Sequence, residues 1–148
     1  MARAPFQVLI LPYLTTSEGM IEYAVFKRSD AGYWQFLSGG GECGETPIIA
    51  AAREAYEEAS IPLESNFFKL DSMAMVPANA FKGHESWGKD VYVIPEHCFA
   101  VEVSSRNFSL SAEHIEHKWG DCLTVSRLLK WDSNRNALWE LNQRLIVT

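Results

Sequence analysis

Three glutamates, Glu54, Glu57 and Glu58, have the i, i+3, i+4 spacing that groups side chains on one side of a helix. Like charges at this spacing destabilise an isolated helix by about 0.2–0.5 kcal/mol per pair. A bound divalent cation would remove that repulsion, and carboxylate oxygens are ligands that suit Mg²⁺, with Mn²⁺ as a substitute. We expect the opposite side of the helix to be buried, and it carries Ile49, Ala52, Tyr56 and Ala59.

A glycine-containing segment, predicted as a turn, precedes this helix at a fixed spacing. Five residues separate Gly39 from Glu45, and seven separate Glu45 from the Arg53–Glu54 pair. The whole pattern resembles the Nudix box, G-x5-E-x7-R-E-U-x-E-E-x-G-U, in which U is apolar. Ser60 stands in place of the last glycine, and Ala55 is a small residue for the first U position. The agreement over the other positions identifies the chain as similar to the Nudix hydrolases.

This resemblance implies hydrolysis of a diphosphate linkage with water and a divalent metal. It implies that the three glutamates face the metal and that Glu54 also takes a proton from the attacking water. Glu45 would pair with Arg53 and hold the loop rigid against the helix. A backbone carbonyl of Ser38 or Gly39 is the further metal ligand that the family pattern implies. Taken without this pattern, the glutamates could also form an ordinary solvated face.

Residues outside the box are candidates for the remaining roles. Glu113 or Glu116 can supply a further acid, which ligates metal or acts as a base; we assign Glu113 to catalysis and Glu116 to the substrate. Lys27 and Arg28, at the end of a predicted strand, are candidates for phosphate contacts. Trp87 lies in a predicted loop and could stack on a substrate ring. The alternative for each charged residue is a solvated side chain, and for a tryptophan it is core packing.

Composition restricts the class of protein. The chain has 148 residues, 47% of them apolar and 22% charged, so we expect one soluble domain over residues 1–148. A net charge of −6 argues against a nucleic-acid polymer as partner. No stretch is apolar enough to span a membrane, and the three cysteines lack disulfide or zinc spacing. We expect a cytoplasmic monomer or homodimer acting on a small molecule.

The order of predicted elements favours an α/β fold with a mixed sheet. Apolar patterning predicts strands over residues 7–11, 20–27, 34–37, 67–76, 90–94, 98–103 and 117–121. It predicts helices over residues 47–59, 124–131 and 134–145, with a loop or mobile hairpin at 78–89. The resemblance implies the Nudix α/β/α sandwich.

Three further segments resemble one branch of the family, whose members hydrolyse dihydroneopterin triphosphate or dATP. They are WQFLSGG at 34–40, ESW at 85–87, and EHIEHKW at 113–119 with SNRNAL at 133–138. The reaction implied is the release of pyrophosphate from a pterin or nucleoside triphosphate, which leaves the monophosphate. Two alternatives stay open: hydrolysis of a dinucleotide or nucleotide sugar, and a non-catalytic binding domain. The intact glutamates argue against the second.

Overall fold

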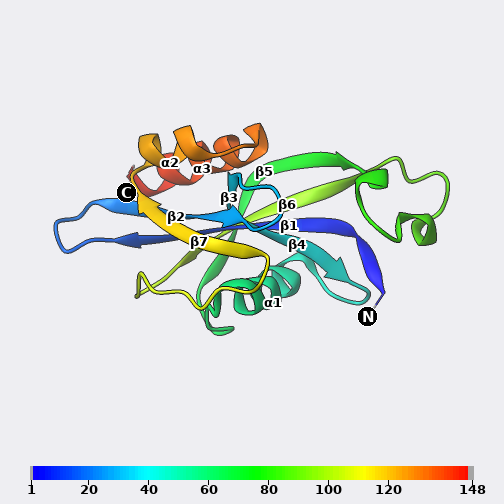
Figure 1. The fold of residues 1–148 in the computed structure, drawn as a ribbon, viewed down its shortest axis with the longest axis horizontal. Helices are drawn as coiled ribbons and strands as arrows, with labels where there is room; N and C mark the ends of the chain where they lie inside the picture. Colours follow the sequence, from blue (N-terminus) through cyan, green and yellow to red (C-terminus); the bar gives the residue numbers. More distant parts are fainter. Residues whose placement is uncertain (1, 147–148) are drawn as a thin grey trace.

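A mixed β-sheet runs through the middle of the molecule, with helices on both of its faces (Figure 1). The structure, a computed structural model, describes residues 2–146. In this part of the chain the sheet has seven strands: β1 (Arg3–Thr15), β2 (Ile21–Arg28), β3 (Trp34–Gln35), β4 (Leu37–Glu42), β5 (Phe67–Pro77), β6 (Val93–Glu102) and β7 (His114–Gly120). The helices are α1 (Pro47–Ala59), α2 (Cys122–Leu128) and α3 (Asp132–Ile146), with short 3₁₀ turns η1 (Ala78–Ala80) and η2 (His84–Trp87).

The long strand β1 organises the sheet. The strand order is β3-β2-β1-β6-β5, with β4 paired to the first half of β1 and β7 paired to β2. Only the β1–β6 pair is parallel among the described strand pairs. Helix α1 covers one face, and α2 and α3 cover the other (Figure 1). The expected α/β/α sandwich with a mixed sheet is therefore confirmed.

Alternate residues of the strands point to two separate cores, as the pleat requires. On β1, Leu9 and Leu11 pack towards α2 and α3, whereas Val8 and Ile10 pack towards α1. We call these two sides the α3 face and the α1 face of the sheet. This alternation decides on which face each polar side chain of a strand lies.

Several predicted boundaries differ from the structure. The glycine segment predicted as a turn is strand β4, and the turn comes after it, at Gly44 with φ of +89°. The two strands expected at 90–94 and 98–103 are one strand, β6, which passes through Pro95. Pro95 has no N–H to donate, but the pairing of β6 with β1 begins one residue later, at Glu96. The strand expected at 117–121 begins earlier, at His114.

Helix α1 begins and ends where the sequence predicts. Pro47 occupies the first turn, and Thr46 is the N-cap residue but makes no side-chain capping bond. Ser60 ends the helix in the left-handed region, with φ 58° and ψ 32°, the conformation that glycine adopts most easily. Its hydroxyl donates a hydrogen bond to the Ser109 carbonyl at 3.2 Å. No helix within residues 2–146 is both long and apolar enough to cross a membrane.

Candidate active site

The buried side of helix α1 shares only Ala59 with the side predicted to be buried. Its buried residues are Ala50, Ala51, Glu54, Ala55, Glu58 and Ala59. Ile49 and Tyr56, expected to be buried, are 55% and 53% exposed. The prediction was wrong because small alanines, rather than large apolar residues, allow the helix to approach the sheet closely. Two of the three box glutamates are thereby carried into the interior.

The glycines of β4 make room for these carboxylates. A Cβ atom at position 39 would lie 2.1 Å from the carboxyl carbon of Glu54, so a residue other than glycine would displace that side chain. At position 40 a Cβ would instead meet the guanidinium of Arg3, and at position 41 the ring of Phe6. Side chains from other parts of the chain therefore pack against these neighbouring glycines on alternate faces of the strand. Glu54 lies directly against the backbone where the sequence predicts a further metal ligand.

Arg53 joins the loop before α1 to the helix. Its guanidinium donates two hydrogen bonds to the Glu45 carboxylate, at 2.8 and 3.0 Å, so the predicted pair forms. It also donates to Glu54 at 3.0 Å, to Glu57 at 2.9 Å and to the Gly40 carbonyl at 2.9 Å. These contacts raise the pKa of Arg53, and the bond from Arg53 lowers that of Glu45. One arginine thus positions two of the three candidate ligands.

Glu58 lies in a second, largely buried group formed with the segment before β7. The Ser111 hydroxyl donates a hydrogen bond to its carboxylate, and the Ser111 N–H donates to its backbone carbonyl at 3.0 Å. The imidazole Nδ1 of His114 lies 3.7 Å from a Glu58 oxygen, and neither ring nitrogen of His114 has a hydrogen-bond partner among the described residues. Glu113 is exposed and close enough for its charge to affect Glu54 and Glu58.

Burial makes the two inward carboxylates difficult to ionise. It raises the pKa of Glu54 to about 7, although Arg53 acts in the opposite direction. It also raises the pKa of Glu58 to about 7, against the bond from Ser111 and together with the charge of Glu113. Both groups would gain from a nearby cation. As their side chains stand, no group of three or more acidic, histidine or cysteine residues in the described chain is arranged to hold a metal ion.

The other predicted site residues are divided between the two faces. Lys27 and Glu116 face each other across β2 and β7 at 3.8 Å, on the α3 face and away from the carboxylates. Arg28 forms an ion pair with Asp30 at 2.8 Å. The bond to Asp30 and the nearby charge of Glu113 both raise the pKa of Arg28. The assignment of these residues to substrate binding stays a prediction.

The predicted loop at 78–89 contains the two 3₁₀ turns, and Trp87 attaches it to β1. The Trp87 indole donates a hydrogen bond to the Arg3 carbonyl at 2.8 Å. The Arg3 guanidinium lies 4.5 Å from the centroid of the Phe81 ring and donates to the Gln7 amide oxygen. Trp87 therefore fixes the loop beside Arg3, and its role in stacking on a substrate stays a prediction.

Arg3, Ser111 and His114 are residues of this region to which the sequence assigned no role. Arg3 has no ion-pair partner within 4 Å in the described chain, and its buried Nε has no hydrogen-bond partner. Burial lowers its pKa, whereas the nearby charge of Glu54 raises it. All three residues are far from the box in sequence, so helical spacing could not have indicated them.

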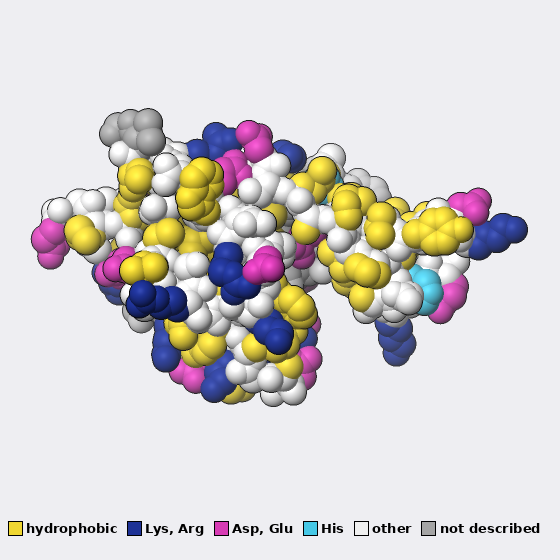
Figure 2. All heavy atoms as spheres, turned by 90° about the horizontal axis from the view of Figure 1, so that it is seen from above, with side chains coloured by type: hydrophobic (Ala, Val, Ile, Leu, Met, Phe, Trp, Pro, Cys, Tyr) yellow, Lys and Arg dark blue, Asp and Glu magenta, His cyan; other side chains and the backbone are white. Residues whose placement is uncertain are grey.

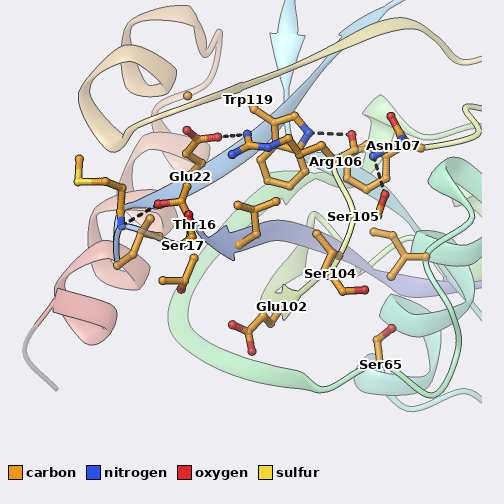
Figure 3. A pocket seen from close by; sticks show the side chains of 18 of the residues that line it. Thr16, Ser17, Glu22, Ser65, Glu102, Ser104, Ser105, Arg106, Asn107 and Trp119 are labelled. Carbon is orange, nitrogen blue, oxygen red and sulfur yellow. Dashed lines mark hydrogen bonds and ion pairs between the residues drawn. The ribbon is translucent and has the colours of Figure 1, made fainter.

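A large cavity lies elsewhere, at the opposite end of β1. It is an open groove of about 1480 Å³, lined by the ends of β1, β6 and β7 and by the residues after α1 (Figure 3). Arg106 and Glu22 form an ion pair there, and the Trp119 indole donates to the Arg106 carbonyl at 2.9 Å. None of the predicted site residues lines this groove. The candidate active site is therefore identified by its side chains and not by cavity size.

Comparison with known families decides between the readings of this carboxylate group. The model of the NUDIX domain matches residues 13–139, which is most of the chain. The chain belongs to the Nudix family. It is thus a Nudix hydrolase that acts on pyrophosphate bonds, and the box glutamates lie on a helix against the glycine strand. The reading of the glutamates as an ordinary solvated face is excluded for Glu54 and Glu58 by their burial.

Individual relatives of this Nudix hydrolase agree with the family assignment. The Escherichia coli (strain K12) protein named dihydroneopterin triphosphate diphosphatase is 27% identical over 138 residues, 92% of this chain and 91% of its own. The crystal structure of a Nudix hydrolase from Listeria monocytogenes superposes with a TM-score of 0.86 at 40% identity, covering 97% of this chain and 96% of its own. The structure of the E. coli dihydroneopterin triphosphate pyrophosphohydrolase superposes with a TM-score of 0.76 at 24% identity, covering 100% of this chain and 99% of its own.

Proposed function

We propose that this Nudix hydrolase cleaves a pterin or nucleoside triphosphate into a monophosphate and pyrophosphate, with a divalent metal bound to the box glutamates. The observation that carries the proposal is the contact of Glu54 with Gly39 beside the buried Glu58. Burial disfavours the ionised form of these two carboxylates, yet both are kept at buried positions where apolar side chains could stand. Hydrogen bonds from Arg53 and Ser111 hold them there. Such an arrangement is unfavourable alone and becomes favourable with a cation.

The donor atoms fit Mg²⁺ or Mn²⁺. Glu54, Glu57 and Glu58 supply hard oxygen ligands, and Gly39 leaves the space that a backbone carbonyl and a carboxylate need to share one ion. The metal would neutralise phosphate charge and increase the acidity of water at the site. Glu57 is about half exposed and is linked to Glu54 through Arg53, so its side chain can turn towards the same ion.

Proton handling falls to Glu54. In the proposed step the oxygen of water bonds to the α-phosphorus, and the bond from this phosphorus to the bridging oxygen breaks. The proton of the water passes to the Glu54 carboxylate, and pyrophosphate leaves with the bridging oxygen. The contact of Glu54 with Gly39, where the further metal ligand is expected, supports this role. Arg53 positions Glu54 through the hydrogen bond at 3.0 Å.

The substrate class is supported by the relatives and by Arg3. Curated relatives with over 90% mutual coverage act, by name, on dihydroneopterin triphosphate. Arg3 brings a cation without an ion-pair partner to the surface of Gly40, next to the glycine that holds Glu54. A partly buried guanidinium with a free N–H is suited to bind phosphate oxygens. We assign Arg3 to the triphosphate.

The experiment is a pyrophosphate-release screen with Mg²⁺ over dihydroneopterin triphosphate, the nucleoside triphosphates, dinucleoside polyphosphates and nucleotide sugars. The proposal predicts that triphosphates are hydrolysed fastest, with pyrophosphate and a monophosphate as the products. Faster hydrolysis of a dinucleotide or a nucleotide sugar would overturn the substrate assignment but leave the family chemistry. Hydrolysis at an undiminished rate in excess chelator would overturn the metal.

A further inference from the structure

A row of residues crosses the α3 face of the sheet beside the glycine strand. Gly40 of β4, Gln7 of β1, Glu96 of β6 and Ala74 of β5 are paired in register on four neighbouring strands. On the two central strands of the row, β1 and β6, the next residues towards α3 are Leu9 and Cys98, which belong to the core under α3. The row therefore lies just outside the area that α3 covers. Gly40 and Ala74, at the two ends of the row, are small, and the Arg3 guanidinium lies over Gly40.

Glu96 is the unusual member of this row. It is 91% buried, and in residues 2–146 its carboxylate takes part in no hydrogen bond or ion pair. The adjacent Gln7 is 8% exposed, and its amide oxygen is already occupied by Arg3. A buried carboxylate without a partner is unfavourable for folding, and an apolar side chain would fill the same space without that penalty. A ligand with N–H donors would relieve the penalty on the ionised carboxylate.

The position of Glu96 relative to the triphosphate site restricts this ligand. Two strand spacings, about 10 Å, separate Glu96 from Gly40 across β1. The Arg3 guanidinium, which lies over Gly40, would bind the phosphates of the substrate. The neighbouring Gly39 contacts Glu54. A substrate that binds Arg3 with its phosphates would thus lay its ring over Gln7 with one edge at Glu96. Figure 2 looks onto this side of the molecule, where residues 78–92 project as an arm from the body.

We propose that Glu96 recognises the 2-amino-4-oxopyrimidine edge that pterins and guanine share. This edge presents a ring N–H and an adjacent amino group, which match the two oxygens of one carboxylate as a guanidinium does. Adenine presents an acceptor nitrogen at the corresponding position and would place a lone pair against the carboxylate. The inference rests on the proposed function and adds to it the residue that selects the ring.

The test compares two probes that differ only in this amino group, dGTP and dITP. For the wild type, kcat/KM is expected to be about 10–100-fold higher for dGTP, because dITP leaves one carboxylate oxygen unpaired. In Glu96→Gln the ratio should fall below about threefold, since an amide has only one acceptor oxygen. Where turnover is slow, the inhibition constants of the two probes against dihydroneopterin triphosphate give the same ratio. Glu102→Gln, an exposed carboxylate on the same strand, is the matched control and should keep the wild-type ratio.

The outcomes separate the two proposals. A wild type that hydrolyses triphosphates but shows equal kcat/KM for dGTP and dITP, or a Glu96→Gln variant that retains the full ratio, would overturn the role of Glu96 alone. A wild type without triphosphate hydrolysis would overturn the proposed function itself. Because the ratio is taken within one variant, a general loss of folded protein does not change it.

Discussion

On one side of strand β4, Gly39 receives Glu54, whose carboxylate is held by Arg53 next to the buried Glu58; on the other side, Gly40 receives Arg3. The carboxylates of the α1 face have hydrogen-bond partners from the protein. Arg3, in contrast, has no ion-pair partner in the described chain, and neither does Glu96 in the same row as Gly40.

This difference separates two tasks within the site. The α1 face is arranged before anything binds, which suits groups that must hold a metal and move a proton with little reorganisation. The α3 face keeps a cation and a carboxylate unpaired, about two strand spacings apart, so its interactions are completed only by a ligand. Catalysis and recognition would therefore respond differently to substitutions on neighbouring residues.

Replacing the two glycines in turn gives the largest contrast. Gly39→Ala would place a Cβ 2.1 Å from the Glu54 carboxyl carbon, and we expect kcat to fall about a hundredfold or more. Gly40→Ala would place a Cβ 2.4 Å from the Arg3 guanidinium carbon. Because that side chain is flexible, KM should rise several-fold with kcat nearly unchanged. Steady-state kinetics on both variants, with circular dichroism as the control for folding, check this. Equal effects on kcat would remove the distinction between the two faces.

The partnerless Glu96 should make stability depend on pH. Burial raises its pKa from 4.5 to about 7, so the folded state holds a proton that the unfolded state has lost between these values. The wild type should therefore lose stability as pH rises from about 4.5 to 7, by roughly 2–3 kcal/mol from this group. Glu96→Gln removes this pH-dependent contribution to stability. The variant should therefore be as stable as the wild type near pH 5 and more stable than it at pH 8. Urea unfolding at both pH values measures the difference; a variant less stable than the wild type at pH 8 would contradict it.

Bound Mg²⁺ should stabilise the folded protein through residues of the α1 face, and this gain in stability should not depend on residues of the α3 face. At ten times its Kd, Mg²⁺ is expected to add about 1.4 kcal/mol, or roughly 3–6 °C in Tm. The gain should persist in Glu96→Gln and disappear in Glu58→Gln, which loses a buried ligand. Differential scanning fluorimetry with and without Mg²⁺ measures it. A gain that survives in Glu58→Gln would place the metal elsewhere.

The same contrast explains how much of the site the sequence could predict. Gly39, Glu45, Arg53 and the glutamates lie within one short segment, so helical spacing and the family pattern indicate them and their pairing. Which side of α1 is buried could not be predicted this way. Apolar patterning places Ile49 inside and the charges outside, whereas the helix packs through alanines and buries carboxylates that a ligand would stabilise.

The α3 face was beyond prediction for a different reason. Gln7 and Glu96 are neighbours only because β1 pairs with β6 in parallel. The register between two strands so distant in the sequence cannot be predicted from either strand alone. The α/β fold class with a mixed sheet followed from the succession of elements. The union of β6 across Pro95 did not, because a proline ordinarily interrupts a strand.

The most direct test of the central claim is the Mg²⁺-dependent turnover of dihydroneopterin triphosphate by Glu57→Gln, with Glu64→Gln, an exposed glutamate beyond α1, as the control. Glu57 is about half exposed, so its loss should leave the melting temperature of the metal-free protein nearly unchanged. The account predicts a fall in kcat by orders of magnitude for Glu57→Gln and wild-type turnover for Glu64→Gln. Near-normal turnover by Glu57→Gln would contradict the assignment of this carboxylate group as the active site.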